Sequence, residues 1–209
     1  MHPDAGGDGT AGLMRVLRTF AFLDLSGFTA FTETYGDIDA VEVIAHLRST
    51  IRSAAQSSGV RVTRWLGDGA MLSGIGAPAV LGCAASICDV ISEQGRLPIR
   101  GGICEGRVIM FEGADYVGAA VNVAAGLCAS AEAGQLLTTA RTASRARAGL
   151  LAVEVGRTPI PGLVADVNVV ALERFCAARS SAGVASMGSS SRSGSSSSPA
   201  GRPRARAAR

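Results

Sequence analysis

The sequence predicts an α+β fold of ferredoxin-like type, in which a mainly antiparallel sheet is covered by helices on one face. The first observation is the order of patterns along the chain, strand, helix, hairpin, helix and strands again, which is typical of such a sandwich. The second is the turn Gly67-Asp68-Gly69 between two strand-like runs, which predicts a β-hairpin. A length of 209 residues suits one such domain with flexible ends.

Each expected element rests on a local pattern. Alternating residues mark strands, and apolar residues three and four apart mark helices. Asp39 can cap the first long helix, and Gly59 and Gly95 follow the ends of the two long helices. In chain order we expect a strand at 19–24, a short helix at 30–34, a helix from 39 to near 59, hairpin strands at 60–66 and 70–75, a helix at 78–93, a strand pair within 97–111 that turns at Glu105-Gly106, a helix at 119–131, a strand at 135–139, a short helix at 142–148, and closing strands at 150–155 and 165–172.

Composition divides the chain into a flexible leader over residues 1–18, one folded domain over 19–176 and a tail over 177–209. The tail is rich in serine, glycine, alanine and arginine, which bury too little apolar surface to offset the entropy of ordering, so we expect it to be disordered. No apolar run approaches the roughly 20 residues of a membrane span, and the start lacks a secretory pattern. We therefore expect a cytoplasmic protein with no membrane span.

Charge and cysteine content narrow the function classes. All 20 basic residues are arginine, and the net charge of +3 comes from the tail, which has no acidic residue. The tail could contact nucleic acid, but no aromatic residue is interleaved for stacking, so a solvated tail is favoured. Five cysteines and two histidines show no metal-ligand spacing, so neither a disulfide framework nor a structural zinc site is expected.

Two aspartates 44 positions apart give the strongest chemical signal. Asp24 ends an apolar run and Asp68 lies between two glycines, so each is expected at a strand end or tight turn where its carboxylate can reach a shared pocket. Paired carboxylates on rigid strands suit a magnesium–nucleotide site. Taken alone, each aspartate could equally be an ordinary turn residue.

The order, spacing and flanking residues of these motifs resemble the class III nucleotide cyclase catalytic domain over residues 19–176. The resemblance implies an adenylate cyclase-type domain that converts ATP to cyclic AMP and pyrophosphate with two Mg²⁺ or Mn²⁺ ions per site. The implied roles are metal binding by Asp24 and Asp68, phosphate binding in the turn that contains Phe28 and Thr29, pyrophosphate binding by Arg107, acceptance of a hydrogen bond from the adenine amino group by Asp115, and ribose orientation by Asn122. Taken without the resemblance, Arg107 could equally be an ordinary exposed strand residue.

Three positions depart from the family pattern. Arg64 stands where the family has a base-selecting lysine, and Gly126 stands where it has the arginine that stabilises the transition state. Ile160-Pro161-Gly162 lies where many relatives have Leu-Lys-Gly. Arginine and lysine are not interchangeable at a fitted site, and glycine offers no side chain at all. Because one lost donor commonly costs about 100- to 1,000-fold in rate, we expect weak activity from the chain alone.

The pattern of losses bears on the partner. In the family, one subunit gives the metal aspartates and the pyrophosphate arginine, and the other gives base selection and the transition-state residues. All three departures fall on the second set, so a homodimer would hold two impaired sites and a heterodimer with an intact cyclase subunit could hold one good site. The alternative is a silent cyclase-like module that binds nucleotide or regulates another cyclase by dimerising with it.

Overall fold

The computed structural model describes residues 14–111, 115–160, 163 and 165–174, which belong to one compact unit, Met1–Cys176. Residues 1–13 of the expected leader and the whole expected tail, 177–209, lie outside the described residues. Within the part of the chain that is described, no helix combines the length and apolar character needed to cross a membrane.

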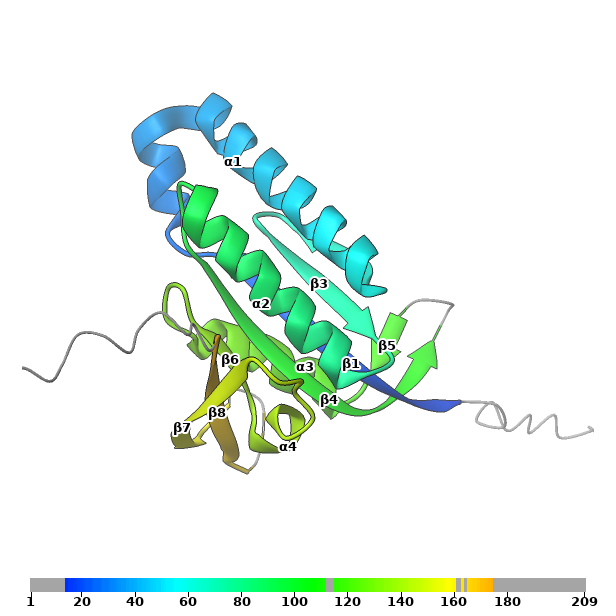
Figure 1. Ribbon diagram of the computed structural model, residues 1–209. Helices are drawn as coiled ribbons and strands as arrows, with labels where there is room; N and C mark the ends of the chain where they lie inside the picture. The colour runs from blue at the N-terminus through cyan, green and yellow to red at the C-terminus, as the bar shows by residue number, and fades with distance from the viewer. Residues whose placement is uncertain (1–13, 112–114, 161–162, 164, 175–209) are drawn as a thin grey trace, which may run out of the picture. The chain divides into compact units, whose positions relative to one another are not determined.

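The sheet has eight strands, in the order β2-β3-β1-β4-β6-β8-β7, with β5 paired to β4 (Figure 1). The β4–β6 pairing is parallel and the other pairings are antiparallel. This arrangement confirms the predicted α+β class. The strands are β1 (Arg15–Leu25), β2 (Arg61–Leu66), β3 (Gly69–Gly74), β4 (Ile99–Phe111), β5 (Asp115–Val117), β6 (Leu136–Thr139), β7 (Leu150–Thr158) and β8 (Val167–Arg174).

Four helices accompany the sheet: α1 (Phe28–Ser58), α2 (Ala77–Gln94), α3 (Ala119–Ser130) and α4 (Ala140–Ala143). Helix α1 is kinked at Gly36, whose φ of 83° and ψ of 174° are not helical. Glycine adopts a positive φ without the steric penalty of a Cβ atom. The kink therefore explains why the sequence shows two separate helical patterns in this region.

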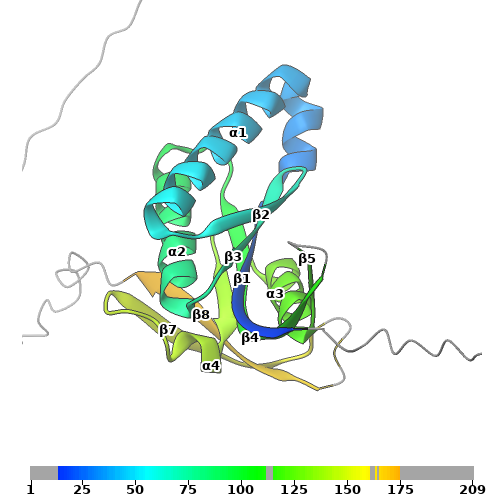
Figure 2. The ribbon, with the colours of Figure 1, turned by 90° about the vertical axis from the view of Figure 1, so that its right-hand side faces the viewer.

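Helices cover both faces of the sheet, so the prediction of helices on one face is wrong. Helices α1 and α2 lie side by side on one face and α3 lies on the other (Figure 2). The reason is visible in β1, where Phe20 packs with α3 residues while the next residue, Ala21, joins the core under α1 and α2. Consecutive buried residues are the pattern of a strand covered on both faces.

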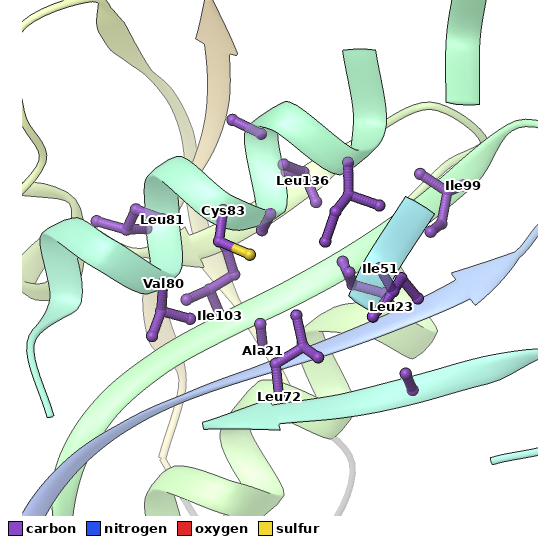
Figure 3. Packing of buried hydrophobic residues seen from close by; sticks show 14 of the residues in the cluster. Ala21, Leu23, Ile51, Leu72, Val80, Leu81, Cys83, Ile99, Ile103 and Leu136 are labelled. Carbon is purple, nitrogen blue, oxygen red and sulfur yellow. The ribbon is translucent and has the colours of Figure 1, made fainter. Parts of the chain in front are cut away.

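The core under α1 and α2 holds the central strands in place. Leu23, Leu72 and Ile103 from three neighbouring strands belong to the same hydrophobic cluster as Ile51 of α1 and Leu81 of α2 (Figure 3). All five side chains are essentially inaccessible to solvent. Burial of this kind stabilises a side chain by about 1.5–3 kcal/mol. This core therefore holds the central strands, including the ends that carry Asp24 and Asp68, in fixed positions.

Strand β4 is continuous over Ile99–Phe111, so the predicted strand pair that turns at Glu105-Gly106 is wrong. Glu105 is tolerated inside the strand because its carboxylate meets Arg145 Nε at 3.1 Å and accepts a hydrogen bond from Thr19. At Gly106, an added Cβ atom would lie 2.8 Å from the Cβ atom of Ala120. This glycine serves the close approach of α3 rather than a turn.

Other boundaries shift by a few residues. Strand β1 begins at Arg15, four residues before the expected start at Thr19, because it pairs with β4 along its whole length. Asp115, which lies between the expected strand pair within 97–111 and the expected helix at 119–131, begins β5. The hairpin of β2 and β3, with Asp68 in its turn, is confirmed.

Candidate functional site

The sheet brings Asp24 and Asp68 to the same corner. Asp24 lies at the end of β1, next to β3, and its Cα partner there is Gly69, the residue after Asp68. The backbone N–H of Leu25 donates to the carbonyl of Asp68 at 3.3 Å. Two residues distant in sequence therefore become neighbours, as the sequence pattern indicated.

Gly69 is required at this junction. A Cβ atom there would lie 2.5 Å from the carbonyl oxygen of Leu23 and 3.3 Å from Oδ1 of Asp24. Any side chain would therefore push the hairpin turn away from β1 and separate the two aspartates. The Gly-Asp-Gly pattern is a matter of packing as well as of turn geometry.

The charge balance of this corner changes the acidity of Asp68. Burial raises the pKa of its carboxyl above the ordinary value, and the nearby charge of Asp24 raises it too, while a backbone hydrogen bond and Arg100 lower it. Two carboxylates that lie close together in a partly buried position repel each other, and this repulsion favours the binding of a cation between them. The donor set thus fits a divalent metal ion.

Arg100 is a site residue that the sequence reasoning missed. Its Nε and Nη2 atoms donate to Oδ2 of Asp24 at 3.0 and 2.8 Å, and this pairing raises the pKa of Arg100. Both side chains are about one-third exposed, at 34% and 29%. A signal was present, because Arg100 is a charged residue between Ile99 and Gly101 in a central strand that is otherwise buried there. A charge in such a place needs a partner.

The structure does not bring Arg107 to the two aspartates. Arg107 lies seven residues further along β4, opposite Leu17 near the far end of β1. At about 3.3 Å per residue, this separation is roughly 23 Å, and an odd number of residues also reverses the face of the strand. Within one subunit, Arg100 rather than Arg107 is the cation beside Asp24.

The start of α1 lies directly after this corner. Gly27 precedes the helix with a φ of 80°, no side chain caps the helix, and its first turn holds no acidic residue. Phe28 packs against the core under α1 and α2, which anchors the first residue, and Thr29 is exposed. Uncapped N–H groups and the positive end of the helix dipole favour an anion at this point.

A pocket of about 170 Å³ opens beside Asp24. It is lined by Phe22, Leu23, Asp24, Leu66, Gly69, Arg100, Ala125, Cys128 and Ala129. Burial and the charge of Asp24 raise the pKa of Cys128 to about 12, so its thiol stays protonated at neutral pH and is a poor metal ligand. Among the described residues, no group of three or more His, Cys, Asp or Glu could hold a metal ion. A metal would therefore be held by the two aspartates, with phosphate and water as its other ligands, as Mg²⁺ prefers.

The remaining candidate residues form a second, more exposed group. Arg64 of β2 and Asp115 of β5 form an ion pair at 2.6 Å, with 59% and 52% of their side chains exposed. Arg64 lies opposite Met71, which lies opposite Phe22, so it shares the sheet face of Asp24. Asn122 is exposed on α3, and Gly126 follows one helical turn later on the same side. The structure thus brings Arg64 to Asp115, the two residues to which the resemblance gives roles in recognition of the base.

Of the third departure, Ile160 is buried, and Pro161 and Gly162 lie outside the described residues. The expected loss of a phosphate-binding cation at this point therefore stays a prediction.

Comparison with solved structures identifies the fold. The chain is similar to the adenylyl cyclase CyaB from P. aeruginosa, with a TM-score of 0.70 and 22% identity over 77% of this chain and 95% of that chain. It is also similar to the guanylate cyclase domain of RhGC from Catenaria anguillulae, solved with GTP, with a TM-score of 0.67 and 17% identity over 77% of this chain and 98% of that chain. The protein has the fold of the class III nucleotide cyclase catalytic domains.

Sequence comparison adds relatives without an assigned activity. The chain is 29% identical over 121 residues to the uncharacterized protein Rv2212 of Mycobacterium tuberculosis and to its counterpart Mb2235 of Mycobacterium bovis. The match covers 57% of this chain and 32% of each relative, so the chain spans about a third of their length. No protein-family model matches the chain.

Proposed function

We propose that the chain is an adenylate cyclase-type domain that converts ATP to cyclic AMP and pyrophosphate, with sites shared between two subunits and weak activity on its own. The observation that carries the proposal is the meeting of Asp24, Asp68 and Arg100 beside the uncapped start of α1. This corner combines two carboxylates for metal, a guanidinium for phosphate and free backbone N–H groups.

In this proposal Asp24 and Asp68 hold two Mg²⁺ or Mn²⁺ ions. When bound, the ions supply activation of the ribose 3'-hydroxyl and neutralisation of charge on the triphosphate. The first turn of α1, at Phe28 and Thr29, binds terminal phosphate oxygens through backbone N–H groups. Arg100 leaves Asp24 and binds the pyrophosphate end, the role that the resemblance assigned to Arg107.

The second group of residues reads the nucleotide. Asp115 accepts a hydrogen bond from the adenine amino group, Arg64 donates to a ring acceptor, and Asn122 orients the ribose. Gly126 gives no charge to the transition state. Loss of such a donor costs about 100- to 1,000-fold in rate, so a homodimer of this chain is a slow enzyme and a heterodimer with an intact cyclase subunit is a better one.

A silent module that binds nucleotide or regulates another cyclase by dimerising with it is the second candidate. Gly126 favours this candidate, because it offers no side chain to stabilise a transition state. Asp24, Asp68 and Arg100 could still hold metal and nucleotide without turnover. Nucleotide binding without product, at every protein concentration and with every cyclase subunit tested, would establish this candidate.

The test is an assay of purified protein with Mn²⁺ and ATP for both products, cyclic AMP and pyrophosphate. We expect slow formation of equal amounts, which disappears in Asp68→Ala. Thermal unfolding with Mn²⁺–ATP runs beside it, because a ligand that binds only the folded state raises the melting temperature whether or not it reacts. Absence of both product and stabilisation would contradict the proposal and would favour a module that regulates another cyclase by dimerising with it, without binding nucleotide.

A further inference from the structure

A second pocket, of about 440 Å³, lies between the last residues of α1, the first half of α2, the connection from α4 to β7 and the end of β8. The elements around it include the lower ends of α1 and α2 in Figure 1. None of the residues assigned above to metal or nucleotide lines it. Pockets for small molecules usually measure about 300–1,000 Å³, so this one has room for a small organic ligand.

The charged residues that line this pocket are Arg147 and Arg174, and no acidic residue lines it. Arg147 is exposed and forms no ion pair within the described part of the chain. Cys83, also in the lining, is uncharged at neutral pH because burial raises the pKa of its thiol. The end of α1 and the start of α2 both lie at the pocket, so their helix dipoles offset each other. The arginines therefore decide the charge of the pocket, which favours an anion.

Arg174 is held against α2 by two contacts. Its Nε atom meets Oδ2 of Asp89 at 2.6 Å, and its Nη2 atom donates to the hydroxyl of Ser86 at 2.7 Å. Asp89 does not line the pocket, but it neutralises the charge of Arg174. Arg147 therefore supplies the uncompensated positive charge, and Arg174 supplies a donor group whose position is fixed.

The wall formed by α2 has a polar end and an apolar end. Ser86 accepts the bond from Arg174, so its own hydroxyl proton is free to be donated to a ligand. Gly82 lies one helical turn earlier on the same side, and Ala79 lies a turn before that. A Cβ atom at Gly82 would meet no atom within 4 Å, so this part of the wall leaves open space. The ligand thus needs an anionic group at one end and a less polar part at the other.

The kind of anion follows from the donors. A phosphoryl group has three acceptor oxygens and nearly two negative charges, whereas a carboxylate has two oxygens and one charge. Two guanidinium groups and a hydroxyl suit the larger number of acceptors. We propose that the pocket binds a small phosphate monoester, whose phosphoryl group contacts Arg147, Arg174 and Ser86 and whose organic part lies over Gly82. This inference goes beyond the proposed function and does not depend on it.

The test titrates phenyl phosphate, without metal, into the full chain labelled with ¹⁵N at glycine. Gly82 and Gly149 line the pocket, whereas Gly27 precedes α1 at the corner of Asp24. We expect saturable shifts of the backbone amide signals of Gly82 and Gly149. A saturable shift of Gly27 alone would place the phosphoryl group at the other corner and would overturn the second site. No saturable shift at Gly82 or Gly149 would overturn it as well, without bearing on the cyclase proposal.

Three further probes separate the parts of the ligand. Phenol, which lacks the phosphoryl group, should bind at least about 10-fold more weakly than phenyl phosphate, since hydrogen bonds between charged groups are worth about 10- to 150-fold in affinity. Benzoate and inorganic phosphate should also bind more weakly, because benzoate has fewer acceptors and inorganic phosphate has no organic part. Benzoate as tight as phenyl phosphate would overturn the phosphoryl assignment, and inorganic phosphate as tight would overturn the assignment of the organic part.

Two charge reversals separate this pocket from general attraction by the arginines of the chain. Arg147→Glu should weaken phenyl phosphate binding at least about 10-fold. Arg157→Glu, at an exposed position on β7 outside the lining, makes the same change of charge and should weaken it less than about 2-fold, because salt screens distant charges. Arg174 is left in place, since its removal would also free Asp89. Equal weakening by both variants would assign the binding to overall charge and would overturn the role of Arg147.

Discussion

The two groups of candidate residues are built in different ways. Asp24 and Arg100 are about one-third exposed and lie on central strands, whereas Arg64 and Asp115 are more than half exposed and lie on β2, the edge strand, and the short strand β5. Asp24 is fixed further by the close approach of Gly69. A substitution at Asp24 or Arg100 therefore disturbs the packing of central strands. A substitution at Arg64 or Asp115 places the new side chain mostly in solvent.

In the proposed cyclase, this difference would give a physical reason for the positions at which the chain departs from the family pattern. Arg64 belongs to the exposed group, where substitution costs little stability, and Gly126 is half-buried on α3. Asp24 and Asp68 remain in the packed corner. We expect Asp24, Asp68 and Arg100 to bind metal and phosphate. We expect the second group, which contains Arg64 and Gly126, to limit the rate of turnover.

The largest effect is expected from removal of one of the two proposed metal aspartates. Asp68→Ala should lower product formation at least about 1,000-fold, because metal ions supply several kcal/mol of charge stabilisation. It should also abolish stabilisation by Mn²⁺–ATP, measured as the melting temperature. Glu154→Ala, an exposed acid on β7 at the far edge of the sheet, is the matched control and should behave as wild type. Retained stabilisation in Asp68→Ala would place the metal elsewhere.

The second largest effect is expected to be an increase in the rate of cyclic AMP formation. Gly126→Arg should raise the rate of cyclic AMP formation about 100- to 1,000-fold by restoring a donor to the transition state. Any arginine for glycine within a helix also stabilises that helix by about 1 kcal/mol. Gly82→Arg on α2 controls for this, because a Cβ atom at Gly82 meets no atom within 4 Å. A similar gain in both variants would assign the effect to stability rather than to catalysis.

The third prediction separates the two arginines of β4. Arg100→Ala should weaken Mn²⁺–ATP binding about 10- to 150-fold, the range for hydrogen bonds to charged groups, and Arg107→Ala should weaken it less than about 2-fold, as for a typical exposed residue. Isothermal titration of both variants measures the difference. The reverse ranking would restore the assignment that the sequence resemblance implied and would remove Arg100 from the substrate site.

A smaller effect is expected from pH. Because the pKa of Asp68 is raised, chiefly by burial, its ionisation opposes folding: its contribution to stability is present below its unfolded pKa of 3.8 and is lost as pH rises through the raised value. Metal-free Asp68→Asn should therefore melt higher than wild type at pH 7, and the gap should close toward acid pH. Asp166→Asn, at an exposed position, is the control. A gap that does not change with pH would contradict the raised pKa.

The smallest effect is expected at the exposed pair. Arg64→Lys should change the free energy of unfolding by less than about 1 kcal/mol, since an exposed ion pair contributes little. Its main effect should be on the ratio of ATP to GTP turnover, because lysine donates from one point and arginine from a planar fork. Urea unfolding and paired turnover assays give the two readouts. A stability loss well above this value would mean that the pair has a structural role.

Local signals explain what could be predicted from the sequence. The Gly-Asp-Gly turn and the apolar run before Asp24 placed both aspartates at strand ends, and the kink at Gly36 falls where the helical pattern is interrupted. These features depend on residues next to one another in the chain. The hairpin and the α+β class follow from the same kind of pattern.

What the sequence did not predict depends on packing between distant segments. Arg100 meets Asp24 only because β4 pairs with β1 in one particular register. Gly106 was read as a turn residue because the approach of α3 over β4 is not encoded nearby. The second covered face of the sheet was missed for the same reason, since a buried strand between two layers and a half-exposed one differ only in a few residues.

The measurement that tests the central claim most directly is complementation between wild type and an Asp68→Ala, Gly126→Arg double variant. The double variant lacks one of the two proposed metal aspartates but has an arginine in place of Gly126, and the wild type has the converse. If sites are shared between two subunits, mixing should give one complete site per heterodimer and a rate of cyclic AMP formation at least about 100-fold above the sum of the separate proteins. A mixed rate equal to that sum would contradict the division of the site into a working and an impaired half.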